Sequence, residues 1–294
     1  MKDVVDEWLL NHFLYQKKAT VLKYKEIVKN HIVPALGEYE MRNIGGTVIN
    51  SFLIQKTSDG RLDHKGGLSN SYVKTMGIIL NSVMIYAAEQ GYCAPLKTKI
   101  AKPIIEKKEI AVMDLKMQLR LEHKLEFDGS LTALGISIAL NTGMRIGEIC
   151  GLRWTDIDLD NRMIRIRHTV ARVEAADMPF GSAKTCLILD RPKTKTSIRD
   201  IPIASKLSAI LEKAVKNKLS EFVVSEKNTF ISPRTFEYRY HKVLEQYGIP
   251  SMNFHCLRHT FATRCIEMNV DVKTLSEILG HANVGITLNT YVHP

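Results

Sequence analysis

The chain has 294 residues, of which 45% are hydrophobic, 7% aromatic and 24% charged, and its formal net charge is +10. This composition argues against long disordered segments, and no apolar run reaches the ~18 residues that a membrane-spanning helix needs. The excess of lysine and arginine suits a polyanionic partner, either nucleic acid or an acidic membrane surface, and the missing membrane span makes action at a membrane the weaker alternative.

The cysteines and the N-terminus indicate a protein of the cytoplasm. The five cysteines are odd in number and none belongs to a Cys-x-x-Cys pair, which predicts reduced, buried thiols rather than a disulfide framework or a zinc ribbon. The N-terminal sequence MKDVVDEWLLNHF carries acidic residues early and has no long apolar core, so it does not resemble a signal peptide. The cysteines are Cys93, Cys150, Cys186, Cys256 and Cys265.

The N-terminal part of the chain begins with two predicted helices. Apolar residues at helical spacing predict them over residues 1–15 and 20–33, and Pro34 is expected to end the second. Lysines surround the polar side of this second helix, which is either a solvated face or a stripe that faces DNA. These lysines are Lys17, Lys18, Lys23, Lys25 and Lys29.

Two more helices follow. Residues 47–56 form one, and after a polar loop that contains glycines a long helix begins at Ser69 or Ser71 and runs through Glu89. Apolar residues recur along the long helix in the 3-4-3 pattern of an antiparallel bundle. They are Val73, Met76, Leu80 and Val83.

The sequence therefore predicts two domains. Residues 1–98 read as an all-α domain, residues 99–108 as a charged linker that contains a proline, and residues 109–294 as a second domain. The second domain is expected to be mainly α with a small antiparallel β-sheet. The fold class is thus mainly α-helical, with an all-α domain followed by an α+β domain.

The expected sheet lies in the middle of the second domain. Residues 163–173 alternate over their first half as a strand does. Residues 185–190 and 198–203 are two further β-like runs, and the basic segment RPKTKTS between them predicts that they pair as a hairpin. Helical periodicity returns from 205 to the end of the chain.

A few residues of the second domain could carry chemistry. Each has an ordinary structural explanation when taken alone: a helix salt bridge, a loop or cap residue, a packed tyrosine, or solvated lysines in a turn. His255 and His259 could bind zinc, but no glutamate of an HExxH motif and no clear third ligand accompanies them. The candidates are Arg145, Glu148, Lys193, Lys195, His255, Arg258, His281 and Tyr291.

Taken together, these residues suit one phosphodiester group. Arginine pairs with phosphate oxygens through two parallel hydrogen bonds, and catalysis of phosphoryl transfer is mainly positioning and charge stabilisation. A tyrosine can act as a covalent nucleophile, and since its pKa is about 10 it must lose its proton during the attack.

Four motifs carry a family resemblance. TGMRIGEICGLRW, PKTKTSIRDIP, HCLRHTFAT and LGHANVGITLNTYVH, in this order, closely resemble the tyrosine recombinases, in particular the integrases of phages and conjugative transposons of Gram-positive bacteria. The resemblance covers nearly the whole chain, because the N-terminal bundle is similar to the core-DNA-binding domain of the family. It implies a catalytic domain at 109–294 and a site-specific recombinase that integrates or excises a mobile element without a cofactor or metal.

The resemblance also assigns the phosphate-binding residues. Arg145 and Arg258 resemble the two arginines that clamp the phosphate, and His281 resembles a histidine that donates a hydrogen bond to it. Glu148 resembles a supporting carboxylate that orients its neighbours.

The proton-transferring residues follow in the same way. Tyr291 resembles the nucleophile that forms a 3′-phosphotyrosyl bond and frees a 5′-hydroxyl, and His255 resembles the histidine that assists proton transfer there. The acid that protonates the leaving oxygen is a lysine of the basic turn. Lys193 fits the family pattern better, and Lys195 stays open.

The implied partner is double-stranded DNA at specific attachment sites in the bacterial cytoplasm, at the nucleoid. On DNA the family forms tetramers, with an excisionase or a DNA-bending protein as an accessory partner. The chain stops at Pro294, three residues after Tyr291, and starts at the core-binding bundle without the arm-binding domain of related integrases. We therefore expect a monomer when free. The alternatives are a relaxing topoisomerase, and an impaired or truncated integrase that acts as a DNA-binding protein.

Overall fold

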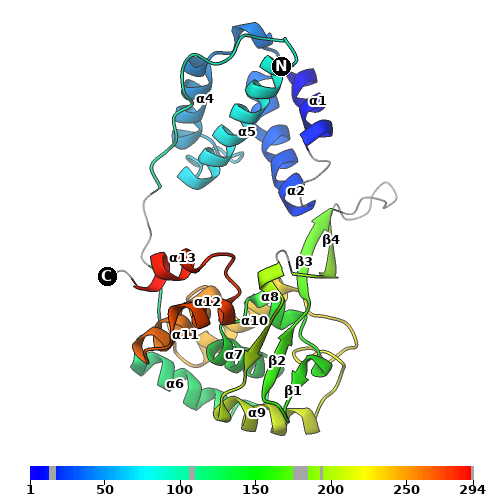
Figure 1. Cartoon of the computed structure of the whole chain (residues 1–294), viewed down its shortest axis with the longest axis vertical. Coiled ribbons are helices and arrows are strands. Elements are labelled where there is room, and N and C mark those ends of the chain that lie inside the picture. Colours follow the sequence, from blue (N-terminus) through cyan, green and yellow to red (C-terminus); the bar gives the residue numbers. More distant parts are fainter. Residues whose placement is uncertain (13–17, 106–109, 175–184, 193–194, 293–294) are drawn as a thin grey trace. The chain divides into compact units, whose positions relative to one another are not determined.

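The computed structural model describes residues 1–12, 18–105, 110–174, 185–192 and 195–292. The chain forms two compact units (Figure 1). The first comprises Met1–Lys108 with Val173–Thr185, and the second comprises Glu109–Arg172 with Cys186–Pro294. Within the described residues, no helix has both the length and the apolar character that crossing a membrane requires, and the five cysteines are free thiols.

The first unit is a helical bundle around the long helix α5 (Asn70–Glu89). The predicted seam of Val73, Met76, Leu80 and Val83 is fully buried, and α1 and α4 pack against it. Ser69 is the N-cap of α5, because its hydroxyl accepts a hydrogen bond from the backbone N–H of Tyr72. The other helical segments are α1 (Lys2–His12), α2 (Lys18–Ile27), η2 (Val28–Ile32), α3 (Val33–Leu36), η3 (Met41–Asn43) and α4 (Gly46–Ser58).

Pro34 does not end the second helix, so that prediction is wrong. The helical run continues through a π-helical turn, η2, in which Val33 donates its N–H to the carbonyl of Val28 five residues back. Pro34 then falls in the first turn of a new α-helical segment, α3, which ends at Leu36. A proline is tolerated in a first turn, since its missing N–H has no helical partner there.

Part of the predicted linker is held against the first unit. The side chain of Asn50 donates to the carbonyl of Lys99 and accepts from the N–H of Ala101, and Asn70 donates to the carbonyl of Ile104. These bonds fix residues 99–104 to α4 and α5. The domain boundaries themselves stay predictions.

The second unit is built around α7 (Leu131–Thr142), which is buried along nearly all of its length. Helix α7 is apolar on all sides, as expected for a helix surrounded by others. Asp114 caps the preceding helix, and its side chain accepts a hydrogen bond from the N–H of Met117. The helices that pack against α7 are α6 (Leu115–Glu126), α8 (Ile146–Cys150), α9 (Ser205–Lys216), α10 (Pro233–Gln246) and α11 (His255–Glu267).

The strands form two small antiparallel sheets rather than the predicted hairpin. One sheet has the order β1–β2–β5, and the other pairs β3 with β4. The runs 185–190 and 198–203 correspond to β4 and β5, so they do not pair with each other, and that prediction is wrong. The strands are β1 (Ile157–Asp158), β2 (Met163–Ile166), β3 (Thr169–Glu174), β4 (Thr185–Asp190) and β5 (Arg199–Pro202).

Side-chain alternation explains this pairing. In β5, Arg199 and Ile201 are buried and their neighbours are exposed. These two residues lie opposite Ile166 and Ile164 of β2, which are buried as well. A strand with one buried face pairs in the register that keeps this face inside. Strand β4 is half-buried along nearly all of its length and lacks such an alternation.

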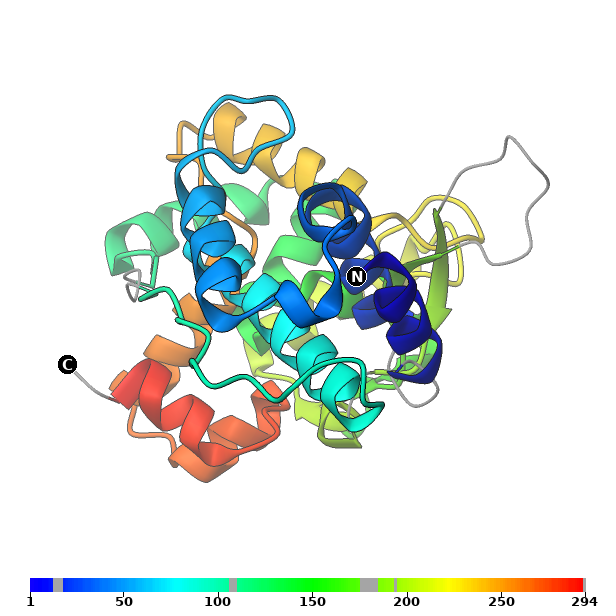
Figure 2. The same cartoon turned by 90° about the horizontal axis from the view of Figure 1, so that it is seen from above.

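The chain ends in a small helical cluster that holds the site. Helices α11, α12 (Val272–Leu279) and α13 (Val284–Thr287) lie side by side in both views, and the π-helical segment η6 (Leu288–Val292) returns to α11 (Figures 1 and 2). A separate apolar cluster joins these elements. It contains Ala262, Cys265, Leu275 and Leu279.

Candidate active site

A glycine turn places Arg145 at the start of α8. Gly143 ends α7 in the left-handed conformation, with φ of 64°. A Cβ at this position would lie 2.6 Å from the ring of Phe261, so the turn requires glycine for its conformation and for its space. Arg145 then stands at the N-cap of α8, and its side chain is 35% exposed. Its guanidinium group is therefore held at the surface of the unit.

Glu148 is the centre of a buried charge network. Its carboxylate accepts from the backbone N–H of Arg145 at 2.9 Å and from the Arg145 guanidinium at 2.8 Å. It also accepts two bonds from Arg199, at 3.0 and 2.9 Å. Burial alone would raise the pKa of Glu148, but the hydrogen bonds and charge of Arg199, with those of Arg145, lower it on balance. Glu148 is thus a carboxylate that orients two arginines.

Arg199 is a further residue of this network that was not among the candidates predicted from the sequence. Besides Glu148, its guanidinium binds the carbonyl oxygens of Ile278 and Ser197. It lies on the buried face of β5, opposite Ile166. The sequence did carry a signal for it, because Arg199 occupies a position in the alternating segment 198–203 where a buried apolar residue would be expected.

Arg258 is almost fully buried, with 2% of its surface exposed. It donates to the carbonyls of Gly143 and Leu279, at 2.8 Å each. Burial, together with the nearby positive charge of Arg145, lowers the pKa of Arg258 to about 9. Arg145 in turn donates to the carbonyl of Gly280 at 3.2 Å. The arginines therefore tie the turn at Gly143 to the turn that follows α12.

This second turn positions His281. Gly280 ends α12 with φ of 65°, and a Cβ there would lie 3.0 Å from Cδ of Arg199 and from the carbonyl oxygen of Thr196. Nδ1 of His281 shares a hydrogen bond of 2.8 Å with the hydroxyl of Thr287. Burial lowers the pKa of His281 to about 4, and the positive charges of the three arginines act in the same direction. The imidazole is therefore neutral at neutral pH.

Tyr291 reaches the site from η6. Its ring packs against the apolar cluster of α11 and α12. Its hydroxyl forms a hydrogen bond of 2.8 Å with Nδ1 of His259. Burial raises the pKa of Tyr291, whereas the charges of Arg258 and Arg145 act to lower it. The hydroxyl is thus within electrostatic reach of both arginines of its own chain.

Two histidines lie one turn apart on α11. The ring of His255 stands edge-on to that of His259, with 4.6 Å between their centroids. The side chain of His255 is exposed, yet the protein atoms around its ring and then its positive neighbours lower its pKa to about 4. The residue that contacts Tyr291 is His259, for which the sequence suggested only a role as a zinc ligand.

The structure does not describe the side chains of the two predicted lysines. Lys193 lies outside the described residues. Lys195 begins the 3-10 turn η5 (Lys195–Ser197), four residues before Arg199, and its side chain is also outside the described part of the chain.

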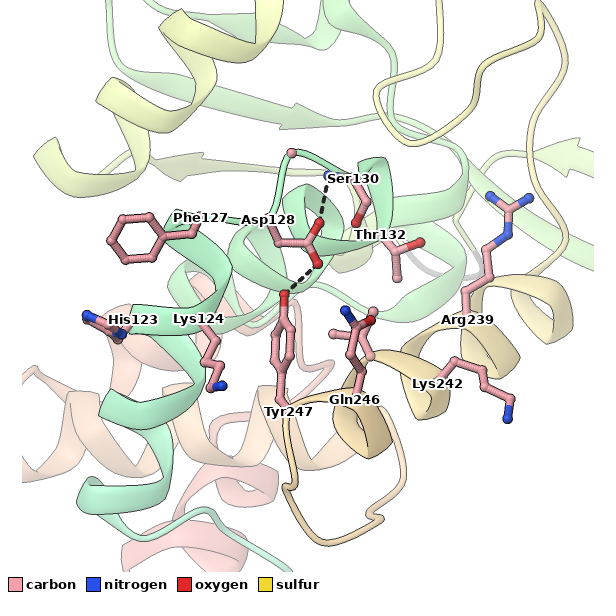
Figure 3. A pocket seen from close by; sticks show the side chains of 12 residues that line it. His123, Lys124, Phe127, Asp128, Ser130, Thr132, Arg239, Lys242, Gln246 and Tyr247 are labelled. Atoms are coloured by element: carbon pink, nitrogen blue, oxygen red, sulfur yellow. Dashed lines mark hydrogen bonds between the residues drawn. The ribbon is translucent and has the colours of Figure 1, made fainter.

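A separate cleft of about 770 Å³ lies between the α6–α7 connection and α10 (Figure 3). Its wall carries Lys124, Arg239 and Lys242, while the carboxylate of Asp128 accepts from Tyr247 and from the N–H of Ser130. The cleft shares no residue with the arginine, histidine and tyrosine cluster, so we assign it no part in the site.

The cluster can hold an anion beside a nucleophile. Arg145, Arg199 and Arg258 bring three positive charges to the site, whereas Glu148 supplies one negative charge at their centre. The sum of these charges is +2, and the single negative charge of a phosphodiester would offset part of it. The tyrosine hydroxyl lies within the same field, so the geometry suits covalent phosphoryl transfer.

Comparison with known proteins identifies the family. The model of the phage integrase family matches residues 120–294, and that of the N-terminal SAM-like domain of phage integrases matches residues 1–55. A XerC-like tyrosine recombinase of Caldanaerobacter subterraneus subsp. tengcongensis is 30% identical over 99% of this chain and 78% of its own length. The transposase of transposon Tn916 of Enterococcus faecalis is 29% identical over 54% of this chain and 41% of its own length.

A solved structure shows the same fold. The integrase of transposon Tn1549, in complex with transposon right end DNA, superposes with a TM-score of 0.80 and 20% identity, over 99% of this chain and 94% of that one. The fold, the family models and the cluster around Tyr291 agree with the resemblance seen in the sequence motifs. The chain belongs to the phage integrase family and is a tyrosine recombinase, an enzyme that cleaves and rejoins DNA.

Proposed function

We propose that Tyr291 is the nucleophile and that Arg145, Arg258 and His281 bind the phosphodiester it attacks. The observation that carries this proposal is the position of the Tyr291 hydroxyl, which lies against a histidine of α11 and within electrostatic reach of Arg258 and Arg145. The tyrosine oxygen forms a bond to phosphorus as the bond to the 5′-oxygen breaks. The products are a 3′-phosphotyrosyl bond and a 5′-hydroxyl.

The arginines are suited to stabilise the transition state. A guanidinium group has five N–H donors in a fixed plane, and two carbonyls hold Arg258 in place while further donors can serve the phosphate. Glu148 and the carbonyl of Gly280 fix Arg145 in the same way. Donors that are already oriented need no reorganisation when charge develops on the phosphate oxygens.

The remaining steps need an acid and a second strand. A lysine of the turn before β5, Lys193 or Lys195, protonates the leaving 5′-oxygen. The phosphotyrosyl bond conserves the energy of the cleaved phosphodiester, so a 5′-hydroxyl of another strand can attack it and rejoin the DNA without ATP. Repeated at specific attachment sites, this exchange integrates or excises a mobile element.

The substrate is double-stranded DNA. The net charge of +10 and the DNA complex of the Tn1549 integrase support this assignment. On its sites the protein assembles into a tetramer, and an excisionase or DNA-bending protein takes part. It acts in the bacterial cytoplasm, on nucleoid DNA.

The test is covalent capture. A nicked suicide duplex, made from the DNA that flanks the coding gene, is incubated with the wild-type protein and with Tyr291→Phe, and the mixtures are resolved on a denaturing gel. We expect a protein–DNA adduct for the wild type only, with equal binding by both forms in a mobility-shift assay. An adduct in the Phe variant would refute the assignment of the nucleophile, and tight binding without an adduct by the wild type would favour a DNA-binding protein.

A further inference from the structure

The partner of the nucleophile is the second of the two histidines on α11. Nδ1 of His259 lies 2.8 Å from the Tyr291 hydroxyl, and the planes of the two rings meet at 54°. His255, one turn earlier, stands with its ring at 86° to that of His259. His255 therefore packs against the His259 ring, and of the two histidines it is His259 that hydrogen-bonds the Tyr291 hydroxyl.

The direction of this hydrogen bond depends on the protonation of His259. A neutral imidazole that carries its proton on Nε2 presents a lone pair at Nδ1, and the tyrosine O–H then donates to it. Burial lowers the pKa of His259, and the positive charge of Arg258 lowers it further. The ring is therefore neutral at neutral pH and can accept a proton.

The surroundings of His259 favour it over His255 as a base. The charge that opposes protonation of His259 comes from Arg258, whereas His255 is opposed by His259, Arg258 and Arg145 together. Helix α7, which packs against α11, has no titratable side chain. The two charged residues of α12, Lys273 and Glu277, are exposed.

We propose that His259 accepts the proton of Tyr291 during strand cleavage, and that His255 positions the His259 ring. The proposal rests on the proposed function, in which Tyr291 is the nucleophile. As the bond from the tyrosine oxygen to phosphorus forms, the hydroxyl proton moves to Nδ1 of His259. The bond from phosphorus to the 5′-oxygen breaks, and that oxygen takes a proton from the lysine acid.

The reverse step restores both groups. When a 5′-hydroxyl attacks the phosphotyrosyl bond, the imidazolium of His259 returns its proton to the departing tyrosine oxygen. The phosphate lies beside Arg258 at that stage, so its negative charge offsets the repulsion between Arg258 and the imidazolium. No oxidant, metal or other reactant enters the step.

The first test compares the pH dependence of single-turnover cleavage in His259→Asn and in a matched control, His255→Asn, on the nicked suicide duplex. Asparagine keeps a polar side chain near Tyr291 but cannot take its proton. We expect His259→Asn to cleave about 10²–10³-fold more slowly at pH 7, since a positioned base contributes on this scale. The wild-type rate should fall at low pH as His259 becomes protonated, which gives the pH profile an acid limb. The rate of His259→Asn should instead rise steadily with the hydroxide concentration and show no such limb.

The control should behave differently. His255→Asn should cleave more slowly than the wild type but keep the acid limb, because His259 still titrates. Loss of the acid limb in His255→Asn with its retention in His259→Asn would move the base to His255. A wild-type rate in His259→Asn would overturn the proposal as well. Equal DNA binding and equal circular dichroism spectra of the variants exclude loss of fold as the cause.

The second test needs no cleavage. In ¹⁵N-histidine NMR of the free wild-type protein, we expect the His259 proton on Nε2, and a changed Nδ1 shift in Tyr291→Phe, where the donor is absent. A proton on Nδ1 would mean that His259 donates to the tyrosine, and this would overturn the proposal. Failure of the proposed function appears separately, as the absence of any adduct with the wild-type protein.

Discussion

Arg199 and Glu148 form a bidentate ion pair inside the second unit, with 5% and 3% of their side chains exposed. The pair joins β5 to the start of α8. Since Arg199 also binds the carbonyls of Ile278 and Ser197, one side chain connects the supporting carboxylate to the turn that carries His281. The residue acts on the site through its neighbours and is a positioning residue.

Removal of one partner from this pair should be costly. We expect Arg199→Met to lower the free energy of unfolding of the second unit by about 3–5 kcal/mol, because Glu148 would be left as a buried, partly compensated charge. Urea unfolding followed by Trp154 fluorescence, in a Trp8→Phe background, reports on this unit, since the chain has two tryptophans and Trp8 lies in the first unit.

A neighbouring pair provides the control. Arg167 and Asp200 are 2.8 Å apart, but 38% and 45% of their side chains are exposed. Arg167→Met should therefore cost at most about 1 kcal/mol. If the two variants unfold at the same urea concentration, the buried pair contributes no more to the free energy of unfolding than the exposed pair does.

The two arginines that we propose as the phosphate clamp should tolerate lysine poorly. We expect Arg145→Lys and Arg258→Lys each to lower the rate of strand cleavage by about 10²–10³-fold, since lysine cannot make two parallel bonds to a phosphate. DNA binding should change little, because other phosphate contacts carry most of the affinity. Single-turnover cleavage and mobility shift, run on the same duplex, check both parts. Near wild-type cleavage by both variants would make these arginines structural.

The helices were predictable because local signals decide them. Ser69 and Asp114 are caps whose side chains bind a backbone N–H three residues on, and the spacing of Val73 and Met76 already defines a buried face. Such features lie within one or two helical turns, so sequence periodicity captures them. The motifs around Arg145, Arg258 and Tyr291 similarly indicated a phosphate-binding site.

The predictions from sequence failed where contacts between distant parts of the chain determine the local structure. Pro34 does not interrupt the helical run, because a π-helical turn ends before it and it falls in the first turn of α3. Strand β5 pairs with β2 because their buried faces match, not with the nearer β4. The contact of His259 with Tyr291 spans 32 residues, and sequence spacing does not show which of the two histidines makes it, so the role of His255 stays a prediction. Arg199 was missed because its partner Glu148 lies 51 residues away.

The basic turn offers a test of its two lysines. We expect Lys193→Ala to be slow on a normal substrate and to be rescued by a 5′-phosphorothiolate, whose sulfur leaves without protonation. Lys195→Ala, if it slows cleavage, should slow it equally on both substrates. Cleavage rates of the two variants on the paired substrates decide the matter, and rescue of the Lys195 variant alone would give that residue the role.

The glycine before His281 should resist substitution. Gly280→Ala requires an L-residue at φ of 65° and places a Cβ 3.0 Å from the carbonyl oxygen of Thr196. We expect a loss of about 1–2 kcal/mol in the free energy of unfolding and slower cleavage, because the His281 turn must shift. Gly129→Ala is the control, since nothing lies within 4 Å of a Cβ there. Equal unfolding midpoints for the two variants would contradict the argument.

The two site histidines should make the second unit less stable in mild acid. The folded-state pKa values of His255 and His281 are about 4, below the ordinary value of 6.5. Between these values the unfolded chain binds more protons than the folded one, so the free energy of unfolding falls as the pH drops from about 6.5 towards 4. Above pH 6.5 both states are neutral at these positions, and the effect is absent.

Urea midpoints at pH 7 and pH 4.5 should therefore differ less in His255→Asn and His281→Asn than in the wild type. A wild-type difference in the two site variants would show that other groups, such as Glu148, account for the acid sensitivity.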